Sequence, residues 1–344
     1  SACGEHSGRT GAMKGALAVR PRRGPRRLRG SRALRHGQVV VQTRNSLRMG
    51  HGSARDLSTD LALHCRAFRE RLGPGAGLRL FFSPGRVNLM GAHLDYNGGP
   101  VMPTAIDRGT FIAARPRSDE RIVLASTLDG QRLEFDLGRI ATERSGRWFD
   151  YPIGVLIEIL ELATDARGSH SRCGLEILFG GNLRVGAGLS SSASICVGFA
   201  LCLDQCWNLE RSRMELVHAA LRAERKFVGV QCGIMDPYAV GLARENCLLW
   251  LDCKDASLEY LPLDAQRFSI AVADTGVRRA LAQGAFNLRV RQCEEAFAGL
   301  RPHQEGATCL RDIRLDVFES HRRELDPVVA RRADHVIHEV ARTF

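Results

Sequence analysis

The sequence predicts an α+β fold in two domains, on three observations. The chain has 344 residues, enough for two domains of ordinary size and a sizeable buried core. Its composition, 44% hydrophobic and 25% charged, is that of a globular protein and excludes a fibrous or wholly disordered chain. Predicted strands and helices are mixed without a strict β-α-β alternation, which disfavours a doubly wound parallel sheet.

Hydrophobic periodicity and turn signals predict the elements in chain order. The first helix is amphipathic, because Leu61, Phe68 and Leu72 share one face ahead of a Gly-Pro-Gly stop. The helix at 212–228 opens with a capping box formed by Ser212 and Glu215. The predicted helices lie at 58–73, 148–163, 190–206, 212–228, 286–300 and 330–344. The predicted strands lie at 78–82, 110–115, 121–126, 173–179, 246–252 and 268–274.

The net charge of +11 lies in an N-terminal tail, residues 1–56. This tail holds 13 Lys and Arg against two acidic residues, so the other 288 residues are electrically balanced. An arginine-rich, acid-poor segment without apolar periodicity is expected to be disordered. It is typical of a transit peptide, of a polyanion-binding arm, or of sequence translated upstream of a start at Met13 or Met49. Because residues 57–344 carry no net charge, we expect no nucleic-acid partner.

The eleven cysteines are scattered singly, without a C-x-x-C pair. Such spacing is typical of free thiols in a reducing compartment and argues against a disulfide scaffold or structural zinc. No apolar run approaches the roughly 20 residues of a membrane-spanning helix, and no secretory signal is found. We therefore expect a cytoplasmic protein that has no membrane partner.

The first motif with chemical meaning is Gly-rich and lies between a predicted strand and a buried helix, at 180–193 (GGNLRVGAGLSSSA). Glycines let backbone N–H groups approach a ligand, and a helix N-terminus adds unsatisfied donors. Three serines offer hydroxyls to phosphate oxygens or to a metal. The alternative is a Gly-rich turn and a serine-capped helix, which needs no ligand. The cluster G-x-G-L-S-S-S-A is more specific than a Walker or Rossmann fingerprint, and it favours phosphate.

A second motif, 83–99 (SPGRVNLMGAHLDYNGG), places a cation, a histidine, a carboxylate and amides in one loop after a strand. Arg86, His93, Asp95 and Asn97 supply the paired donors and acceptors that hydroxyl-rich ligands such as sugars need. The alternative is that Asp95 and Asn97 cap turns and that Arg86 makes a surface ion pair.

The third motif, 224–236 (ERKFVGVQCGIMD), contains two acids. Glu224 falls on the apolar stripe of its helix, where an uncompensated carboxylate is costly, so it needs either a neighbouring arginine or a bound metal. Asp236 precedes Pro237, the arrangement of a helix N-cap with proline at the first position.

Together and in this order, the three motifs resemble the galactokinase branch of the GHMP sugar and metabolite kinases. PGRVNLMGAHLDYNGGPVMPTAI is similar to the family's first signature, GAGLSSSAS to its second, and GVQCGIMDPYAVGL, LLWLDC and FNLRVRQCEEA to further blocks. The resemblance covers about 57–344. It implies a complete N-terminal GHMP kinase domain at 57–255 and a partial, ferredoxin-like C-terminal domain at 256–344.

The resemblance also implies an activity: phosphorylation of the C1 hydroxyl of galactose, or of a close derivative, by ATP and Mg²⁺. Asp236 would be the base that takes the proton from this hydroxyl, and Arg86 the cation near it and the γ-phosphate; phosphoryl transfer needs such positioning and charge neutralisation. The implied sugar-binding residues are Arg86, Ala92, His93, Asp95, Gly233, Asp236 and Phe286. The implied ATP-binding residues are Gly186, Ala187, Gly188, Leu189, Ser190, Ser191, Ser192, Trp148 and Tyr151. The implied Mg²⁺ ligands are Ser192 and Glu224.

Two sugar-binding positions depart from the family's pattern. Ala92 stands where the family has a glutamate that accepts a hydrogen bond from the C6 hydroxyl, and Phe286 where it usually has a sugar-contacting tyrosine. Loss of the glutamate's charge would admit a sugar carboxylate, and the string Gly-Ala-His also occurs in galacturonate kinases. Galacturonate is therefore an alternative acceptor to galactose.

The family's third Gly-rich signature, G-x-x-x-T-G-x-G-x-G-G, is absent. We therefore expect an incomplete C-terminal domain and a monomer that aggregates or turns over poorly as it stands. A non-catalytic sugar and ATP sensor is a further alternative, which the intact Ser190–Ser192, Glu224 and Asp236 disfavour. A nucleic-acid-binding role rests on the basic tail alone.

Overall fold

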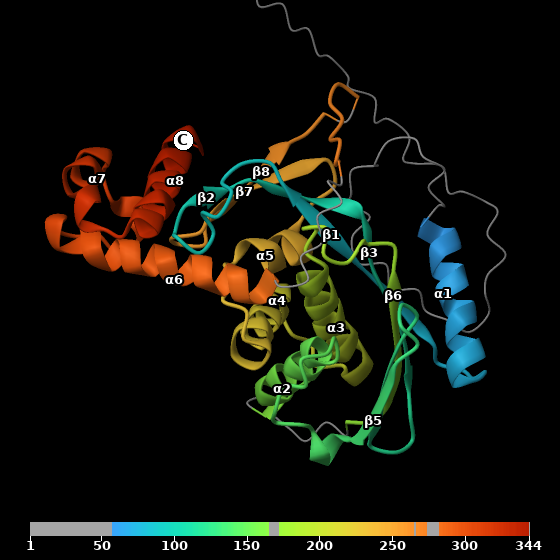
Figure 1. Ribbon diagram of the computed structural model, residues 1–344. Coiled ribbons are helices and arrows are strands. Elements are labelled where there is room, and N and C mark those ends of the chain that lie inside the picture. The colour runs from blue at the N-terminus through green and yellow to red at the C-terminus, as the bar shows by residue number, and fades with distance from the viewer. Residues whose placement is uncertain (1–56, 165–171, 265, 274–281, 344) are drawn as a thin grey trace, which may run out of the picture. The chain divides into compact units, whose positions relative to one another are not determined.

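The computed structural model describes residues 57–343, without 165–171, 265 and 274–281. A five-stranded sheet has the order β1-β3-β6-β4-β5, and all its neighbours are antiparallel except the parallel pair β4 and β6 (Figure 1). Its strands are β1 (Arg79–Asn88), β3 (Pro103–Pro116), β4 (Arg121–Ser126), β5 (Arg132–Asp136) and β6 (Leu175–Gly181). An antiparallel three-stranded sheet has the order β2-β7-β8 and is made of β2 (Pro100–Val101), β7 (Cys247–Asp252) and β8 (Leu258–Pro262).

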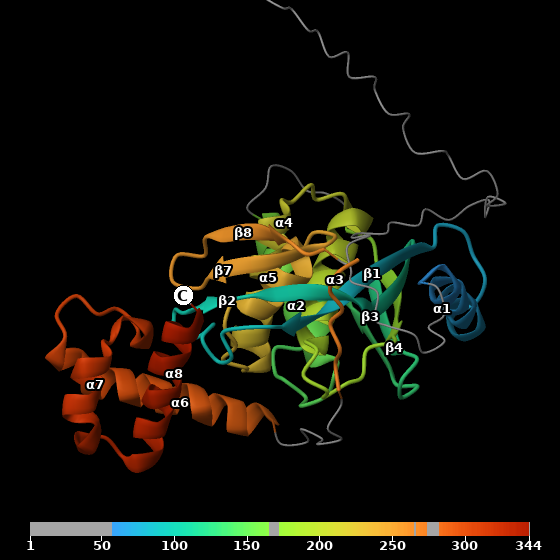
Figure 2. The same ribbon diagram turned by 90° about the horizontal axis from the view of Figure 1, so that it is seen from above.

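Helices cover both faces of the five-stranded sheet (Figure 2). Phe82 faces α1 (Leu57–Leu72), where it packs in one buried cluster with Phe68. Phe81 faces the other way and joins the large cluster with α2 (Asp150–Thr164) and α3 (Ser191–Trp207). Successive side chains of a strand point to opposite faces, so one apolar run serves both layers.

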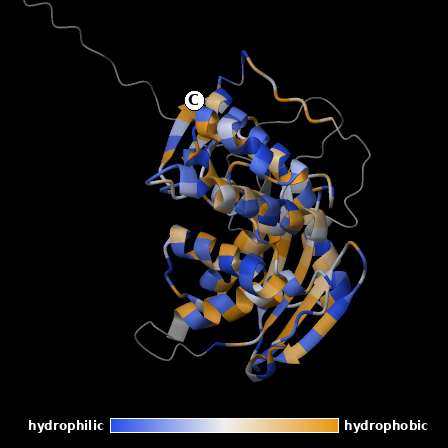
Figure 3. Ribbon diagram, turned by 60° about the vertical axis from the view of Figure 1, so that its left-hand side comes forward, coloured by the Kyte–Doolittle hydropathy of each residue, from blue (hydrophilic) through white to orange (hydrophobic). Residues whose placement is uncertain are grey.

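The helix α4 (Arg213–Arg222) starts at the predicted capping box and continues as one π-helical turn, Ala223–Val228. Helix α5 (Met235–Leu242) follows and packs against α3 and α4. Helices α6 (Ala282–Leu300), α7 (Leu315–His321) and α8 (Pro327–Thr343) pack together around a buried core. Hydrophobic and hydrophilic residues alternate along these helices (Figure 3), as expected for helices with one buried and one exposed face.

The α+β prediction is confirmed. For most predicted helices and strands, at least one predicted boundary lies within two residues of the observed boundary. The strand predicted at 268–274 is wrong over 268–273, which has no regular structure. A strand needs a neighbour to pair with, and in the described part of the chain this run pairs with none, leaving Phe268 55% exposed. The elements β2, β5, β8, α5 and α7 were not predicted.

The domain division stays a prediction; β7 and β8 pair with each other across the predicted boundary at 255/256. The basic tail lies outside the described residues. Within the described ranges, no helix is both long and apolar enough to cross a bilayer.

Replacing Phe68 with alanine tests the packing of α1. The ring is fully buried, so Phe68→Ala is expected to lower the free energy of unfolding by about 3–5 kcal/mol in urea titrations. The control Leu63→Ala lies on the same helix with 43% exposure, and its effect should stay within about 0.5 kcal/mol. A loss below about 1 kcal/mol for Phe68→Ala would show that α1 does not pack as described.

Candidate active site

The centre of the site is an ion pair between Arg86 of β1 and Asp236 in the first turn of α5. Arg86 Nε donates to Asp236 Oδ1 at 2.7 Å, and Nη2 lies 2.5 Å from the same oxygen. The two side chains are 12% and 23% exposed. A charge-assisted bond of this length, largely shielded from water, holds the carboxylate in one orientation. Asp236 lies inside the helix and Ile234 at the N-cap, so the N-cap alternative for Asp236 is wrong.

The Gly-rich loop (residues 180–193) contacts both members of this ion pair. Arg86 Nη1 donates to the Gly188 carbonyl at 2.7 Å, and the Arg86 amide donates to the Leu189 carbonyl at 3.2 Å. Ser190 donates its hydroxyl to Asp236 Oδ2 at 2.6 Å. Both oxygens of Asp236 are therefore engaged, one by β1 and one by the loop.

Ser190 precedes α3 in a left-handed conformation (φ 59°), and its side chain does not cap the helix. A non-glycine residue held with positive φ is strained, and such strain gathers at functional sites. The serine-cap alternative for this position is wrong, since the hydroxyl points to Asp236 instead. The loop turns through Gly186 and Gly188, whose φ values of 75° and 76° lie in the left-handed region that favours glycine.

Glu224 lies in the π-helical turn after α4 and is 2% exposed. The pKa of Glu224 is raised to about 7: burial is the largest cause and the negative charge of Asp236 adds to it, while a hydrogen bond from Ser192 and the charge of Arg86 oppose them. Its Oε1 atom has no hydrogen-bond partner among the described residues. A π-bulge often marks a functional site, and this one carries a buried carboxylate oxygen that is open to a cation.

Asp95 approaches the same centre from the loop between β1 and β2. The pKa of Asp95 is raised to about 7: burial is the largest cause and the charge of Asp236 adds to it, while the charge of Arg86 opposes them. Gly233 packs directly on this side chain, since a Cβ at position 233 would lie 2.2 Å from Asp95 Oδ2. The close approach explains why glycine stands there.

Two further sugar-binding candidates belong to a network between this loop and α6. Arg289 Nη1 donates to His93 Nε2 at 2.8 Å, so that nitrogen accepts, and His93 Nδ1 lies 3.0 Å from the Tyr96 hydroxyl. Phe286 packs edge-on against Tyr96 with ring centroids 5.5 Å apart. Ala92, next to His93, is exposed. Tyr96 and Arg289 were not predicted as site residues, although Tyr96 lies in the motif 83–99 and Arg289 in the block FNLRVRQCEEA.

A cavity of about 290 Å³ lies beside the Gly-rich loop. Trp148 and Tyr151 line it together with Ser191 and Ser192, so the structure brings the predicted adenine residues and two of the predicted ATP-binding loop residues to one cavity. The other predicted loop residues, 186–190, do not line it. The indole Nε1 of Trp148 is buried and has no hydrogen-bond partner among the described residues. Sequence reasoning missed most of the other walls, which come from separate strands and loops. They include Gly109, Thr110, Ser126, Leu128, Phe179 and Ile195.

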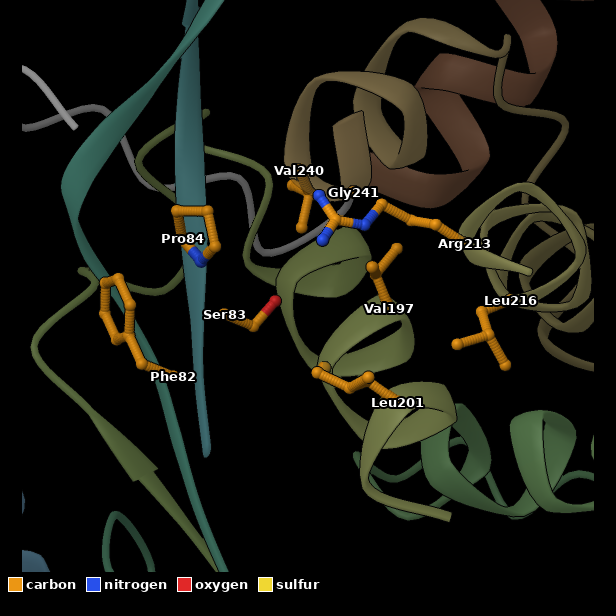
Figure 4. Close-up of a pocket in the computed structure, with 10 residues that line it drawn as sticks. Phe82, Ser83, Pro84, Val197, Leu201, Arg213, Leu216, Val240 and Gly241 are labelled. Carbon is orange, nitrogen blue, oxygen red and sulfur yellow. The ribbon is translucent and has the colours of Figure 1, made fainter. Parts of the chain in front are cut away.

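A much smaller cavity of about 20 Å³ lies between β1, α3, α4 and α5 (Figure 4). Ser83 points its hydroxyl toward this space, and Val197 and Leu201 form its apolar wall. The volume suffices for about one water molecule. It therefore does not compete with the larger cavity as a ligand site.

The raised pKa of Glu224 predicts a pH dependence of stability. The folded state holds a proton on Glu224 up to about pH 7, but an unfolded glutamate releases it near 4.5. The contribution to the free energy of unfolding is therefore full below about pH 4.5 and is lost as the pH rises through 7. Glu224→Gln, which does not titrate, should gain about 1–3 kcal/mol over the wild type between pH 5 and pH 8, measured by urea unfolding in EDTA. Parallel curves for the two proteins would contradict the buried carboxylate.

Known proteins match this chain over the same segments. Residues 66–116 match the galactokinase galactose-binding signature, and residues 152–244 match the GHMP kinases N terminal domain. The galactokinase of Clostridium beijerinckii is 38% identical over 269 residues, which cover 77% of this chain and 67% of that protein. The galactokinase of Bacillus subtilis is 36% identical over 277 residues, covering 79% and 69%.

A solved structure, Lactococcus lactis galactokinase complexed with galactose, superimposes with a TM-score of 0.73 at 30% identity. The match covers 83% of this chain and 72% of that one. The sequence matches to the two family models include the segments that hold the three motifs, which meet at Asp236. The chain therefore belongs to the galactokinase family of GHMP sugar kinases.

Proposed function

We propose that this chain transfers the γ-phosphoryl group of ATP to the C1 hydroxyl of galactose, giving galactose 1-phosphate and ADP. The observation that carries the proposal is the position of Asp236: Arg86 of β1 and Ser190 of the Gly-rich loop hold its two oxygens, and its charge acts on Asp95 of the sugar loop (residues 89–99). In this proposal Asp236 is the base, the Gly-rich loop binds ATP and the sugar loop binds the acceptor.

Asp236 accepts the proton of the C1 hydroxyl as that oxygen forms its bond to the γ-phosphorus. The bond between the γ-phosphorus and the bridging oxygen breaks, and ADP leaves with the electron pair. Arg86 orients the carboxylate and offsets negative charge that gathers around the transferred group. Backbone and hydroxyl groups of the Gly-rich loop bind the phosphates at the start of α3.

Ser192 and Glu224 fit a Mg²⁺ ion. Magnesium prefers oxygen ligands, and Glu224 offers a buried carboxylate oxygen with no hydrogen-bond partner among the described residues, next to the Ser192 hydroxyl. Bound there, the cation would neutralise charge on the phosphates. Its charge would also favour the ionised form of Glu224.

The cavity lined by Trp148 and Tyr151 suits the adenine ring. Ser191 and Ser192 line it as well, so the cavity adjoins the end of the Gly-rich loop. The unpartnered indole N–H offers a donor to a ring nitrogen, and the aromatic faces offer stacking area.

The negative charge of Glu339 favours galactose over galacturonate, and its position beside Ala92 is not evident from the sequence. Glu339 of α8 accepts hydrogen bonds from the amides of Gly91 and Ala92, both at 3.2 Å. A carboxylate therefore stands beside Ala92 although residue 92 carries none. An acceptor with a carboxylate near Ala92 would meet a like charge.

We further propose a cytoplasmic monomer. All ten cysteines in the described part of the chain are free thiols, as expected in a reducing compartment. Gel filtration of the purified chain tests the monomer, and a second peak at twice the mass would contradict it.

Asp236→Asn tests the proposed base. The amide keeps the shape but cannot accept the proton, so kcat for galactose should fall by about 10²- to 10⁴-fold while the KM for ATP stays within about threefold. Formation of ADP in a coupled assay measures both constants. The control Asp255→Asn, on an exposed turn after β7, should retain wild-type kcat. A kcat for Asp236→Asn within about fivefold of wild type would exclude Asp236 as the base.

Competition between galactose and galacturonic acid tests the acceptor. Because Glu339 adds a negative charge beside Ala92, kcat/KM should favour galactose by roughly tenfold or more. Mass spectrometry of the sugar phosphates formed from an equal mixture measures the ratio. An excess of galacturonate 1-phosphate would restore the alternative acceptor.

A further inference from the structure

Helix α8 makes direct contact with the turn Gly91–His93, which belongs to the sugar loop. Glu339 Oε1 accepts from both the Gly91 and the Ala92 amides. One turn earlier on the helix, His335 Nε2 lies 2.9 Å from the Ala92 carbonyl and so donates to it. Two side chains of α8 therefore engage three backbone groups of this turn.

The backbone of the turn leaves these groups in need of partners. Gly91 has a φ of 81°, and a Cβ there would lie 2.2 Å from the Pro100 carbonyl oxygen. His93 also has a positive φ, 66°. This backbone cannot join a regular strand ladder, and Gly91 is buried, so water does not replace a missing partner of its N–H group. Glu339 supplies that partner.

The carboxylate of Glu339 is ionised where it lies. Burial raises its pKa, but hydrogen bonds from Arg342 and from the Ala92 and Gly91 amides outweigh burial and leave the pKa below its ordinary value. Arg342 Nε and Nη2 lie 3.0 and 2.6 Å from Oε2. The two amide bonds are therefore charge-assisted, which makes them stronger than neutral ones. With its side chain 16% exposed, Glu339 is also shielded from competing water.

We propose that Glu339 is a positioning residue for the sugar acceptor: from α8 it holds the turn Gly91–His93 in the conformation that presents His93 and Asp95 to the sugar. The inference rests on the proposed function and adds to it a determinant more than 200 residues away in sequence. Trp148, Tyr151, Ser191 and Ser192, which line the nucleotide cavity, lie on other elements. Loss of Glu339 should therefore weaken the binding of sugar and spare that of ATP.

Three variants of the full 344-residue chain test the proposal. Glu339→Ala removes both amide bonds and should raise the KM and the calorimetric Kd for galactose by about tenfold or more, because each charge-assisted bond contributes strongly. Its KM for ATP should stay within about twofold. Glu339→Gln keeps an oxygen that accepts from the same amides, so its galactose KM should return to within about threefold of wild type. Asp334→Ala is the matched control, an acid of the same helix that pairs with His338, and should behave as wild type.

Two results would overturn the proposal. The first is a galactose Kd for Glu339→Ala equal to that of Asp334→Ala. The second is a parallel rise in the ATP and galactose constants, which indicates general damage to the fold. If Glu339→Ala does not fold, as judged by its thermal transition, His335→Ala replaces it: the galactose Kd must rise at least threefold or so with an unchanged ATP Kd, and no rise refutes the proposal. A wild-type chain that binds no galactose refutes the proposed function instead.

Discussion

The contact between Arg86 and Asp236 joins the three elements that form the candidate active site: β1, α5 and the start of α3. The two residues are 150 positions apart in sequence, one on the edge strand β1 and one on the short helix α5. Because Arg86 also donates to the Gly-rich loop and Ser190 bonds the second oxygen of Asp236, one buried cation fixes β1, α5 and the start of α3 together. Removal of either partner would leave the other charge uncompensated in a shielded place.

The same arrangement concentrates negative charge. Asp95, Glu224 and Asp236 surround one arginine, and burial with mutual repulsion raises the pKa of two of them to about 7. Such crowding opposes folding in the absence of a ligand, since buried carboxylates lose hydration. It also prepares the site for cations and for proton transfer near neutral pH. The strained Ser190 is consistent with a site whose geometry is set by the surrounding fold.

Local features of this fold were predictable from the sequence because their signals are local. The helix with the Ser212–Glu215 capping box starts where the box predicts. The three motifs gave the candidate base, its cation and the serine cluster, and the structure brings Arg86, Ser190 and Asp236 into contact.

What was missed depends on contacts between distant segments. No local pattern indicates that Glu339 binds the backbone of the sugar loop, and the block that contains Arg289 does not specify its contact with His93. The alternating run at 268–273 has the pattern of a strand, but pairing depends on a neighbour that no local pattern specifies. Serine is a typical N-cap residue, but the side chain of Ser190 points to Asp236 instead of capping α3, and only the approach of Asp236 explains this direction.

A double-mutant cycle of Arg86→Ala and Asp236→Ala, read as kcat for galactose, tests most directly whether the ion pair is the functional centre. If the two residues act as one unit, kcat falls by about 10²-fold or more in each single variant. The kcat of the double variant is then no more than about threefold below that of the less active single variant. Losses that multiply in the double variant would show that Arg86 and Asp236 act independently, and would contradict the account.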